Sequence, residues 1–417
     1  MAVLSIEGGI LVKKKVNNNI RMHVFYVFML IFMIGLAVTT TFIGNLTPNI
    51  IEHYKLNYSQ AGSINLLFQI GGFVSLLLGG MFSDRLKKSN IIIAAAIIMS
   101  GGLCLIGITP PYVFLLVILF SLGMSTQILN ILTSGYTCDI VSVGKQNGYV
   151  TFLLAFYSIG STVASQLSVR LSNTVWTNRF LVIGLASGVL ALLFLGSKFV
   201  LGEPDNVGIE EAATGEEAAS YSMKQLWKMV KNYKYLLILI MAFLYTGHQT
   251  TIMMWFPTYL MDNLKFSEVF MGSVISLYWI GVLFGRILYT LVFRKLPETK
   301  FILGSSVLGS VLLAAAIFMG SPIMWKVGIT GLGILTGALF PLFIMLGCSL
   351  FPQNSGSASS FVGVAFALGS ALFPYALGFV AEFVDLEVSI YISVLALLVI
   401  GILILVGKFD REEKKER

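Results

Sequence analysis

The chain alternates long apolar runs with short polar segments, and the pattern recurs twelve times. Each run is long enough for an α-helix to cross the hydrocarbon core of a bilayer, which takes about 20 apolar residues. The pattern therefore predicts an all-α membrane protein with twelve transmembrane helices. The expected spans are 22–46, 60–82, 90–108, 112–139, 147–170, 178–198, 235–260, 267–292, 300–320, 324–350, 356–382 and 387–407.

Composition supports lipid as the main solvent of this chain. Hydrophobic residues make up 57% and charged residues 11% of the sequence, and the mean hydropathy is +0.88, values that a water-facing surface could not accommodate. The net charge is +7, but the basic residues form no patch with interleaved aromatics, so we expect no nucleic-acid partner. Cys104, Cys138 and Cys348 stand singly inside apolar runs, so we expect no disulfide, metal site or cofactor.

Lysine and arginine concentrate in the segments on one side of the predicted membrane. The opposite side keeps Lys55, Arg170, Arg179, Lys265 and Lys326. Because basic residues favour the cytoplasmic side, this bias predicts cytoplasmic termini in the cell membrane.

The connection between the sixth and seventh spans is the long one, and it separates two halves that echo each other. At a spacing of 210 residues, Ile70 aligns with Ile280 and Gly71 with Gly281, as in a parallel repeat of six helices. The expected parts are a cytoplasmic N-terminal segment (1–21), a first six-helix bundle (22–198), a cytoplasmic linker with an interfacial helix (199–234), a second bundle (235–407) and a cytoplasmic tail (408–417).

The segment GMFSDRLKKS, which closes the second span, resembles the loop motif G-x-x-x-D-R/K-x-G-R/K-R/K of the major facilitator superfamily. The matching residues are Gly80, Asp84, Arg85 and Lys88, whereas Lys87 and Ser89 depart from the motif. The resemblance implies that these residues gate the cytoplasmic side, and that Asp139 joins the same charge network. The alternatives are a basic loop that only sets topology and an ordinary solvated acid at a helix end.

A more specific resemblance covers YTGHQTTIMMWFPTYL and SLYWIGVLFGRIL, which look like the fucose and glucose symporter branch of that superfamily. The fitting residues are Tyr245, Gly247, Trp255, Tyr259, Leu260, Trp279, Gly281, Gly285 and Arg286, while Gln249 replaces the glutamate of the branch. The resemblance implies a sugar carrier. The missing glutamate leaves proton symport, sodium coupling, exchange and facilitated diffusion open.

Polar and aromatic residues at membrane depth are the candidates for solute binding, because they are costly there unless they face a path or a partner. The candidate set is Asn130, Gln127, Gln249, His248, Tyr245, Trp255, Trp279, Arg286, Asn65 and Gln69. Amides and aromatic rings suit a neutral polyol. Each residue also has a structural alternative: helix packing for His248 and the amides, interfacial anchoring for the tryptophans, and charge pairing for Arg286.

We therefore expect an alternating-access transporter for a small polar solute, and among such solutes a sugar. Arg286 suggests an organic-anion carrier as the alternative, and a sensor or scaffold on the same fold is the non-transport alternative. Three scattered histidines supply no catalytic constellation, so we expect no enzyme. The expected partners are the solute, a coupling proton or sodium ion and the lipid bilayer, with the chain acting as a monomer.

Overall fold

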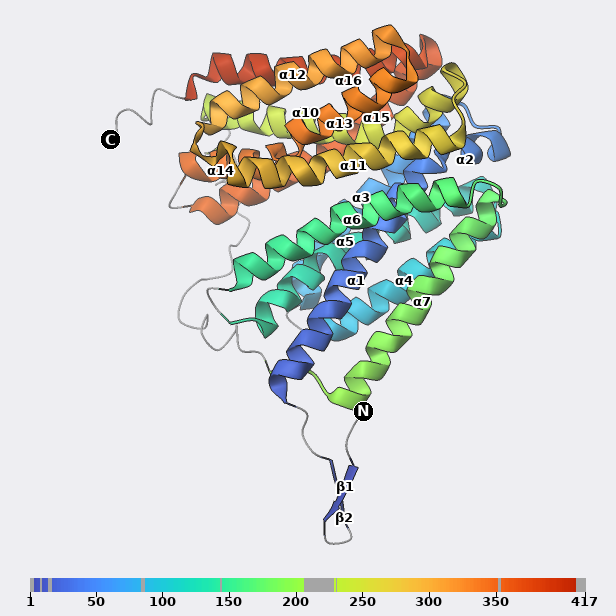
Figure 1. The fold of residues 1–417 in the computed structure, drawn as a ribbon, viewed down its shortest axis with the longest axis vertical. Helices are drawn as coiled ribbons and strands as arrows, with labels where there is room; N and C mark the ends of the chain where they lie inside the picture. The colour runs from blue at the N-terminus through green and yellow to red at the C-terminus, as the bar shows by residue number, and fades with distance from the viewer. Residues whose placement is uncertain are drawn as a thin grey trace. The chain divides into compact units, whose positions relative to one another are not determined.

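The structure is a computed structural model that describes residues 4–7, 10–13, 17–83, 87–142, 145–205, 229, 231–351 and 354–409; for 4–7, 10–13, 76–83, 147, 151, 294, 355 and 356 it describes the backbone alone. Figure 1 shows a chain built almost wholly of long helices. They are α1 Asn18–Asn45, α2 Thr47–Tyr54, α3 Tyr58–Ser83, α4 Lys88–Gly107, α5 Tyr112–Ile140, α6 Gln146–Arg170, α7 Trp176–Leu201, α10 Tyr233–Thr258, α11 Glu268–Leu291, α12 Glu298–Met319, α13 Pro322–Thr336, α14 Leu339–Leu350, α15 Ser355–Phe383 and α16 Leu386–Gly407.

All twelve predicted spans are helical, and their ends lie within a few residues of the predicted ones. Among the described residues, eleven helical segments are long and apolar enough to cross a membrane, with α13 and α14 counted as one. The twelfth apolar run is α3, whose side chains are described as far as Ser75. The all-α membrane fold is therefore confirmed.

Several local features were not predicted. The short helix α2 follows α1 directly and carries Pro48 in its first turn, where proline costs no hydrogen bond. Pro257 lies inside α10, and the π-helical turn η1 (Tyr259–Asn263) follows it, as expected where proline disturbs the hydrogen-bond ladder. A 3-10 turn, η2 (Phe293–Lys295), follows α11, and the strands β1 (Leu4–Glu7) and β2 (Ile10–Lys13) form an antiparallel hairpin.

The chain divides into two compact units. Unit 1 draws on Met1–Thr39, Gly71–Gly160 and Thr177–Glu217, and unit 2 on Thr40–Ile70, Ser161–Trp176 and Ala218–Arg417. Unit 2 thus joins α2 and the adjoining ends of α1, α3 and α6 to the C-terminal helices. In unit 2, α10 packs on α15 and α16, and α13 packs on α11 and α12. The predicted interfacial helix of the linker lies outside the described residues.

The repeat seen in the sequence is visible in helix packing. In α3, a Cβ placed on Gly71 would lie 2.0 Å from the carbonyl oxygen of Phe120 in α5; in α11, a Cβ on Gly281 would lie 2.4 Å from that of Thr330 in α13. Both pairs are related by the same offset of 210 residues (281 − 71 and 330 − 120). Glycine is needed at both places because no side chain fits between the backbones. The two halves therefore share their packing as well as their sequence pattern.

Candidate functional site

A polar and aromatic cluster in unit 2 joins α10 to α11. Gln249 is half-buried, and its Nε2 donates to the hydroxyl of buried Tyr278 over 3.4 Å. One turn further along α10, Met253 accepts a hydrogen bond from the indole of Trp279, whose ring is 5.7 Å from that of Tyr278. We call Gln249, Met253, Tyr278 and Trp279 the α10–α11 cluster. It combines an amide, a hydroxyl and a flat indole, which are the groups that recognise a sugar ring.

Tyr245 extends this face of α10 by one turn, since residues 245, 249 and 253 are spaced by four. Its side chain is fully buried, and its hydroxyl donates to the carbonyl of Thr336 in α13. Arg286 is half-buried on α11 and donates from Nε to the carbonyl of Gly337. Within the described part of the chain, no carboxylate pairs with Arg286, so its guanidinium keeps donors for another acceptor.

Two predicted residues donate hydrogen bonds to backbone carbonyls of α15. The indole of Trp255 is buried and donates to the carbonyl of Pro374 in α15. Asn65 in α3 donates from Nδ2 to the carbonyl of Ser370, also in α15. A further bond, from the backbone N–H of Tyr58 to Glu382, ties the first turn of α3 to the same helix. The two bonds from α3 therefore join the two halves of the chain inside unit 2, whereas the Trp255 bond joins two helices of the second half.

His248 lies beside Gln249 in the sequence but contacts a different helix. It is fully buried, and its Nδ1 is 2.8 Å from Oγ and 3.0 Å from the carbonyl of Ser393 in α16. These contacts favour the helix-packing alternative for His248.

Three further candidate amides lie in the first half of the chain, two of them in unit 1 and one in unit 2. Gln127 and Asn130 are half-buried on α5 in unit 1, and Gln127 packs beside Gly72 of α3. Gln69 is half-buried on α3 in unit 2, where it occupies the repeat position of Trp279 (279 − 210). A role for Gln127, Asn130 and Gln69 in solute binding stays a prediction.

Of the residues predicted to form the cytoplasmic gate, the structure describes the side chains of Lys88 and Asp139. Lys88 begins α4, and its Nζ is 2.7 Å from Oδ2 of Asp139 near the end of α5. The Asp139 side chain is 12% exposed, so water screens this ion pair only in part. Asp84 and Arg85 lie outside the described residues, as do the surroundings of Gly80. Their gating role remains a prediction.

We expect Asp139→Asn to slow transport about tenfold, because the neutral amide loses the charge-assisted bond that holds α4 to α5. Solute affinity should change little, because Asp139 lies in unit 1 and the α10–α11 cluster lies in unit 2. Uptake rates in proteoliposomes and equilibrium binding of the solute give the two quantities. The double variant Lys88→Asp with Asp139→Lys restores opposite charges and should recover part of the rate. Equal losses of binding and flux in a folded protein would contradict the gating role.

A second charge cluster lies where the chain leaves α7. Glu203 accepts hydrogen bonds from Lys198 and from Ser89, and the backbone carbonyl of Glu203 accepts one from Arg21 of α1. Burial acts to raise the pKa of the Glu203 carboxyl, but the bonds from Lys198 and Ser89 outweigh it and hold the pKa below its usual value. A lowered pKa in the folded state stabilises the fold above the ordinary carboxyl pKa, and this contribution disappears as the pH falls through the lowered value.

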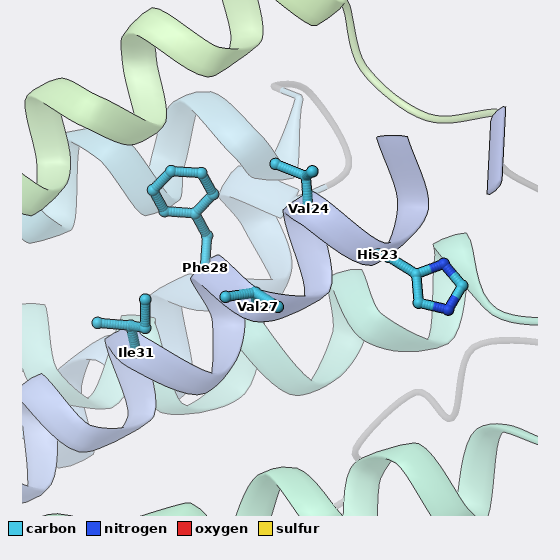
Figure 2. A pocket seen from close by; sticks show the side chains of 5 residues that line it. All are labelled: His23, Val24, Val27, Phe28 and Ile31. Carbon is cyan, nitrogen blue, oxygen red and sulfur yellow. The ribbon is translucent and has the colours of Figure 1, made fainter. Parts of the chain in front are cut away.

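One surface groove is formed by α1 alone. Figure 2 shows its lining, with His23 at one end and Val24, Val27, Phe28 and Ile31 along the helix. An apolar groove of this kind on a membrane helix suits contact with lipid and contains none of the predicted binding residues. Among the described residues, no three His, Cys, Asp or Glu side chains gather as metal ligands.

Sequence reasoning missed Tyr278 and Met253. Tyr278 stands directly before Trp279 in the motif that suggested the symporter branch, but a tyrosine in an apolar run gives no sign of which helix it meets. Met253 has no polar signal at all, and its place in the cluster follows from its spacing of four from Gln249.

Comparison with known proteins agrees with this architecture. The sequence model of the Major Facilitator Superfamily matches residues 27–374. The chain is 22% identical over 392 residues to the glucose/mannose transporter GlcP of Bacillus subtilis, covering 92% of this chain and 94% of the relative. Among solved structures, it is similar to the nucleoside transporter NupG (TM-score 0.71, 14% identity, 92% and 98% coverage) and to a variant of the E. coli fucose:proton symporter FucP (TM-score 0.60, 17% identity, 92% and 99% coverage).

Proposed function

We propose that this chain, which belongs to the Major Facilitator Superfamily, moves a sugar across the cell membrane by alternating access. The observation that carries the proposal is the α10–α11 cluster, where the half-buried amide of Gln249 lies beside a tyrosine hydroxyl and an indole. Amides both donate to and accept from hydroxyl groups, and an aromatic face packs on the apolar face of a sugar ring. The likeness to a glucose/mannose transporter along nearly the whole chain supports the same solute class.

Reconstitution tests this proposal directly. Purified protein in liposomes should take up labelled glucose, mannose or galactose with saturable kinetics, and an excess of the unlabelled sugar should compete. A thermal-shift screen against the same sugars gives an independent measure, because a ligand that binds the folded state raises its apparent stability. A protein with neither saturable flux nor sugar binding would instead fit a sensor or scaffold on this fold.

An organic anion is the second candidate solute, and Arg286 is the observation that favours it. Its guanidinium is half-buried with one bond, to a backbone carbonyl, and it has no carboxylate partner in the described part of the chain. Arginine binds carboxylates and phosphates in a two-pronged geometry. If the solute is anionic, Arg286→Lys should weaken its binding strongly, whereas a neutral sugar should be little affected by the same change.

We also propose that transport of the solute is coupled to a proton or a sodium ion. We propose cytoplasmic termini and a cytoplasmic 199–234 linker, since lysine and arginine are enriched in the segments on that side.

On a background without Cys104, Cys138 and Cys348, a membrane-impermeant thiol reagent added to intact cells should leave Ala212→Cys unmodified. Ala212 lies outside the described residues, and its expected protection follows from the charge bias alone. The matched control is Lys55→Cys, since Lys55 is exposed just after α2 and lies on the opposite side in the proposed topology. Labelling of Ala212→Cys with no labelling of Lys55→Cys would invert the topology.

A further inference from the structure

A buried layer of polar side chains joins α1 to α6 within unit 2. Thr41 and Asn45 lie one turn apart on α1, and Ser161, Ser165 and Ser168 line the buried face of α6. All five residues are at most 2% exposed. The Asn45 amide spans the two helices, because its Nδ2 donates to Ser165 over 3.4 Å and to Ser168 over 3.3 Å. We call these five residues the α1–α6 polar layer.

Hydrogen bonding inside this layer is incomplete. Ser165 gives its only hydroxyl proton to the carbonyl of Ser161, so it can only accept from Asn45. This fixes the Nδ2 side of the Asn45 amide toward α6. Among the described residues, Asn45 Oδ1, Thr41 Oγ1 and Ser161 Oγ then have no hydrogen-bonding partner. Buried oxygens without partners are costly, and a bound ion or water is one of the reasons that a protein keeps them.

The second half of the chain fills the equivalent place differently. Trp255 follows Asn45 by 210 residues (255 − 45), and its indole donates to the carbonyl of Pro374. Gly378 follows Ser168 by the same offset (378 − 168), and a Cβ placed there would lie 3.1 Å from the indole ring. An indole therefore packs where the first half has an amide and a hydroxyl. The first half therefore has polar atoms at the place that an aromatic ring fills in the second half.

Thr251 gives a second comparison between the halves. It follows Thr41 by 210 residues (251 − 41), and its hydroxyl donates to the carbonyl of Gly247 in its own helix. The threonine of the second half is therefore satisfied locally, whereas that of the first half has an oxygen available as a ligand.

We propose that the α1–α6 polar layer binds a sodium ion. Hydroxyl and amide oxygens are the ligands of hard cations, and the layer offers at least three of them. The layer contains no carboxylate, which favours a monovalent ion over calcium or magnesium, because those ions bind through carboxylates. The role of this ion as the coupling ion rests on the proposed transport function, but the binding itself does not.

Thermal melting of the purified full-length protein tests the site without any solute. Sodium should raise the melting temperature in a saturable way when it replaces choline at constant ionic strength, since it binds the folded state. Thr41→Val and Ser161→Ala each remove one oxygen ligand and should weaken the apparent sodium affinity roughly tenfold or more. Both variants should melt in choline at or above the wild-type temperature, because each removes a buried oxygen that has no partner. Thr251→Val is the matched control and should keep the wild-type sodium affinity.

Two results would overturn the site: the same melting curve in sodium and in choline, or wild-type sodium affinity in both variants. In either case the layer holds water only. Sugar binding measured on the same samples separates this inference from the proposed function. Sugar binding without a sodium response refutes the ion site alone, and a sodium response without sugar binding or flux refutes the sugar-transport proposal alone.

Discussion

Gly285→Ala is expected to destabilise the protein strongly, with a free-energy cost of roughly 1 to 3 kcal/mol or a failure to fold. A Cβ at this position of α11 would lie 2.1 Å from the carbonyl oxygen and 2.9 Å from the Cα of Ile334 in α13. Both atoms belong to backbone, so no flexible side chain can give way. The α11 and α13 helices would have to separate along their whole contact, which also includes Gly281, Gly333 and Gly337. Melting temperature and the yield of monodisperse protein are the measurements.

Gly304→Ala is the matched control for this prediction. Gly304 lies in α12, and a Cβ there would meet no atom within 4 Å among the described neighbours. Alanine favours a helix over glycine by about 0.5–1 kcal/mol, so this change should leave stability unchanged or slightly raised. Gly71→Ala should behave like Gly285→Ala, because a Cβ on Gly71 would lie 2.0 Å from the carbonyl oxygen of Phe120. Equal stability of all three variants would mean that the helices are not packed this closely.

The sequence was sufficient to locate the helices because a helix that crosses lipid must be apolar along its whole length. In a chain this hydrophobic, a run of about 20 apolar residues bounded by polar ones indicates a transmembrane helix, and the twelve predicted spans agree with the structure. Helix breaks inside these runs were not predicted, because no polar residue marks them. The α13–α14 break falls at Gly337 and Ala338, two small residues that continue the apolar run, and a Cβ on Gly337 would lie 2.5 Å from the carbonyl oxygen of Val282.

The residues of the candidate site were predicted less completely than the helices, because the sequence does not show which neighbour each helix face meets. Tyr245 and Gln249 were both predicted as candidates for solute binding, and they do lie along the side of α10 that meets α11 and α13. His248 was grouped with them, yet it contacts Ser393 in α16. A helix that is apolar all round gives no pattern to show which neighbour each face meets. The partners of Gln249 and His248 therefore had to come from the structure.

Gln249→Leu and Asn130→Leu are each expected to weaken solute binding tenfold to a hundredfold. Gln249 uses Nε2 on the Tyr278 hydroxyl, which orients the amide and leaves Oε1 to accept from a sugar hydroxyl. Leucine has nearly the same volume but no polar atom, so the buried hydroxyl of a bound sugar would lose its partner, at a cost of roughly 1 to 3 kcal/mol. Asn130 is half-buried on α5 in unit 1, and its expected effect follows from the sequence alone, since a buried amide there is costly unless it serves a ligand or a partner. Binding is measured by equilibrium titration on protein whose melting temperature is unchanged.

Two further variants show whether such a loss comes from the lost hydrogen bond. Gln249→Glu keeps the size of the side chain and an oxygen acceptor but loses the NH2 donor, so it should retain more affinity than Gln249→Leu. Thr250→Val changes the next residue of α10, which projects about 100° away around the helix, and should leave affinity unchanged. If Gln249→Leu and Asn130→Leu both bind the sugar as the wild type does, the site lies elsewhere. If the hydrogen bond of Gln249 binds the solute, a substitution at the neighbouring position should not weaken binding. An affinity loss in Thr250→Val as large as that in Gln249→Leu would therefore show that α10 tolerates no substitution, and would contradict a specific role for Gln249.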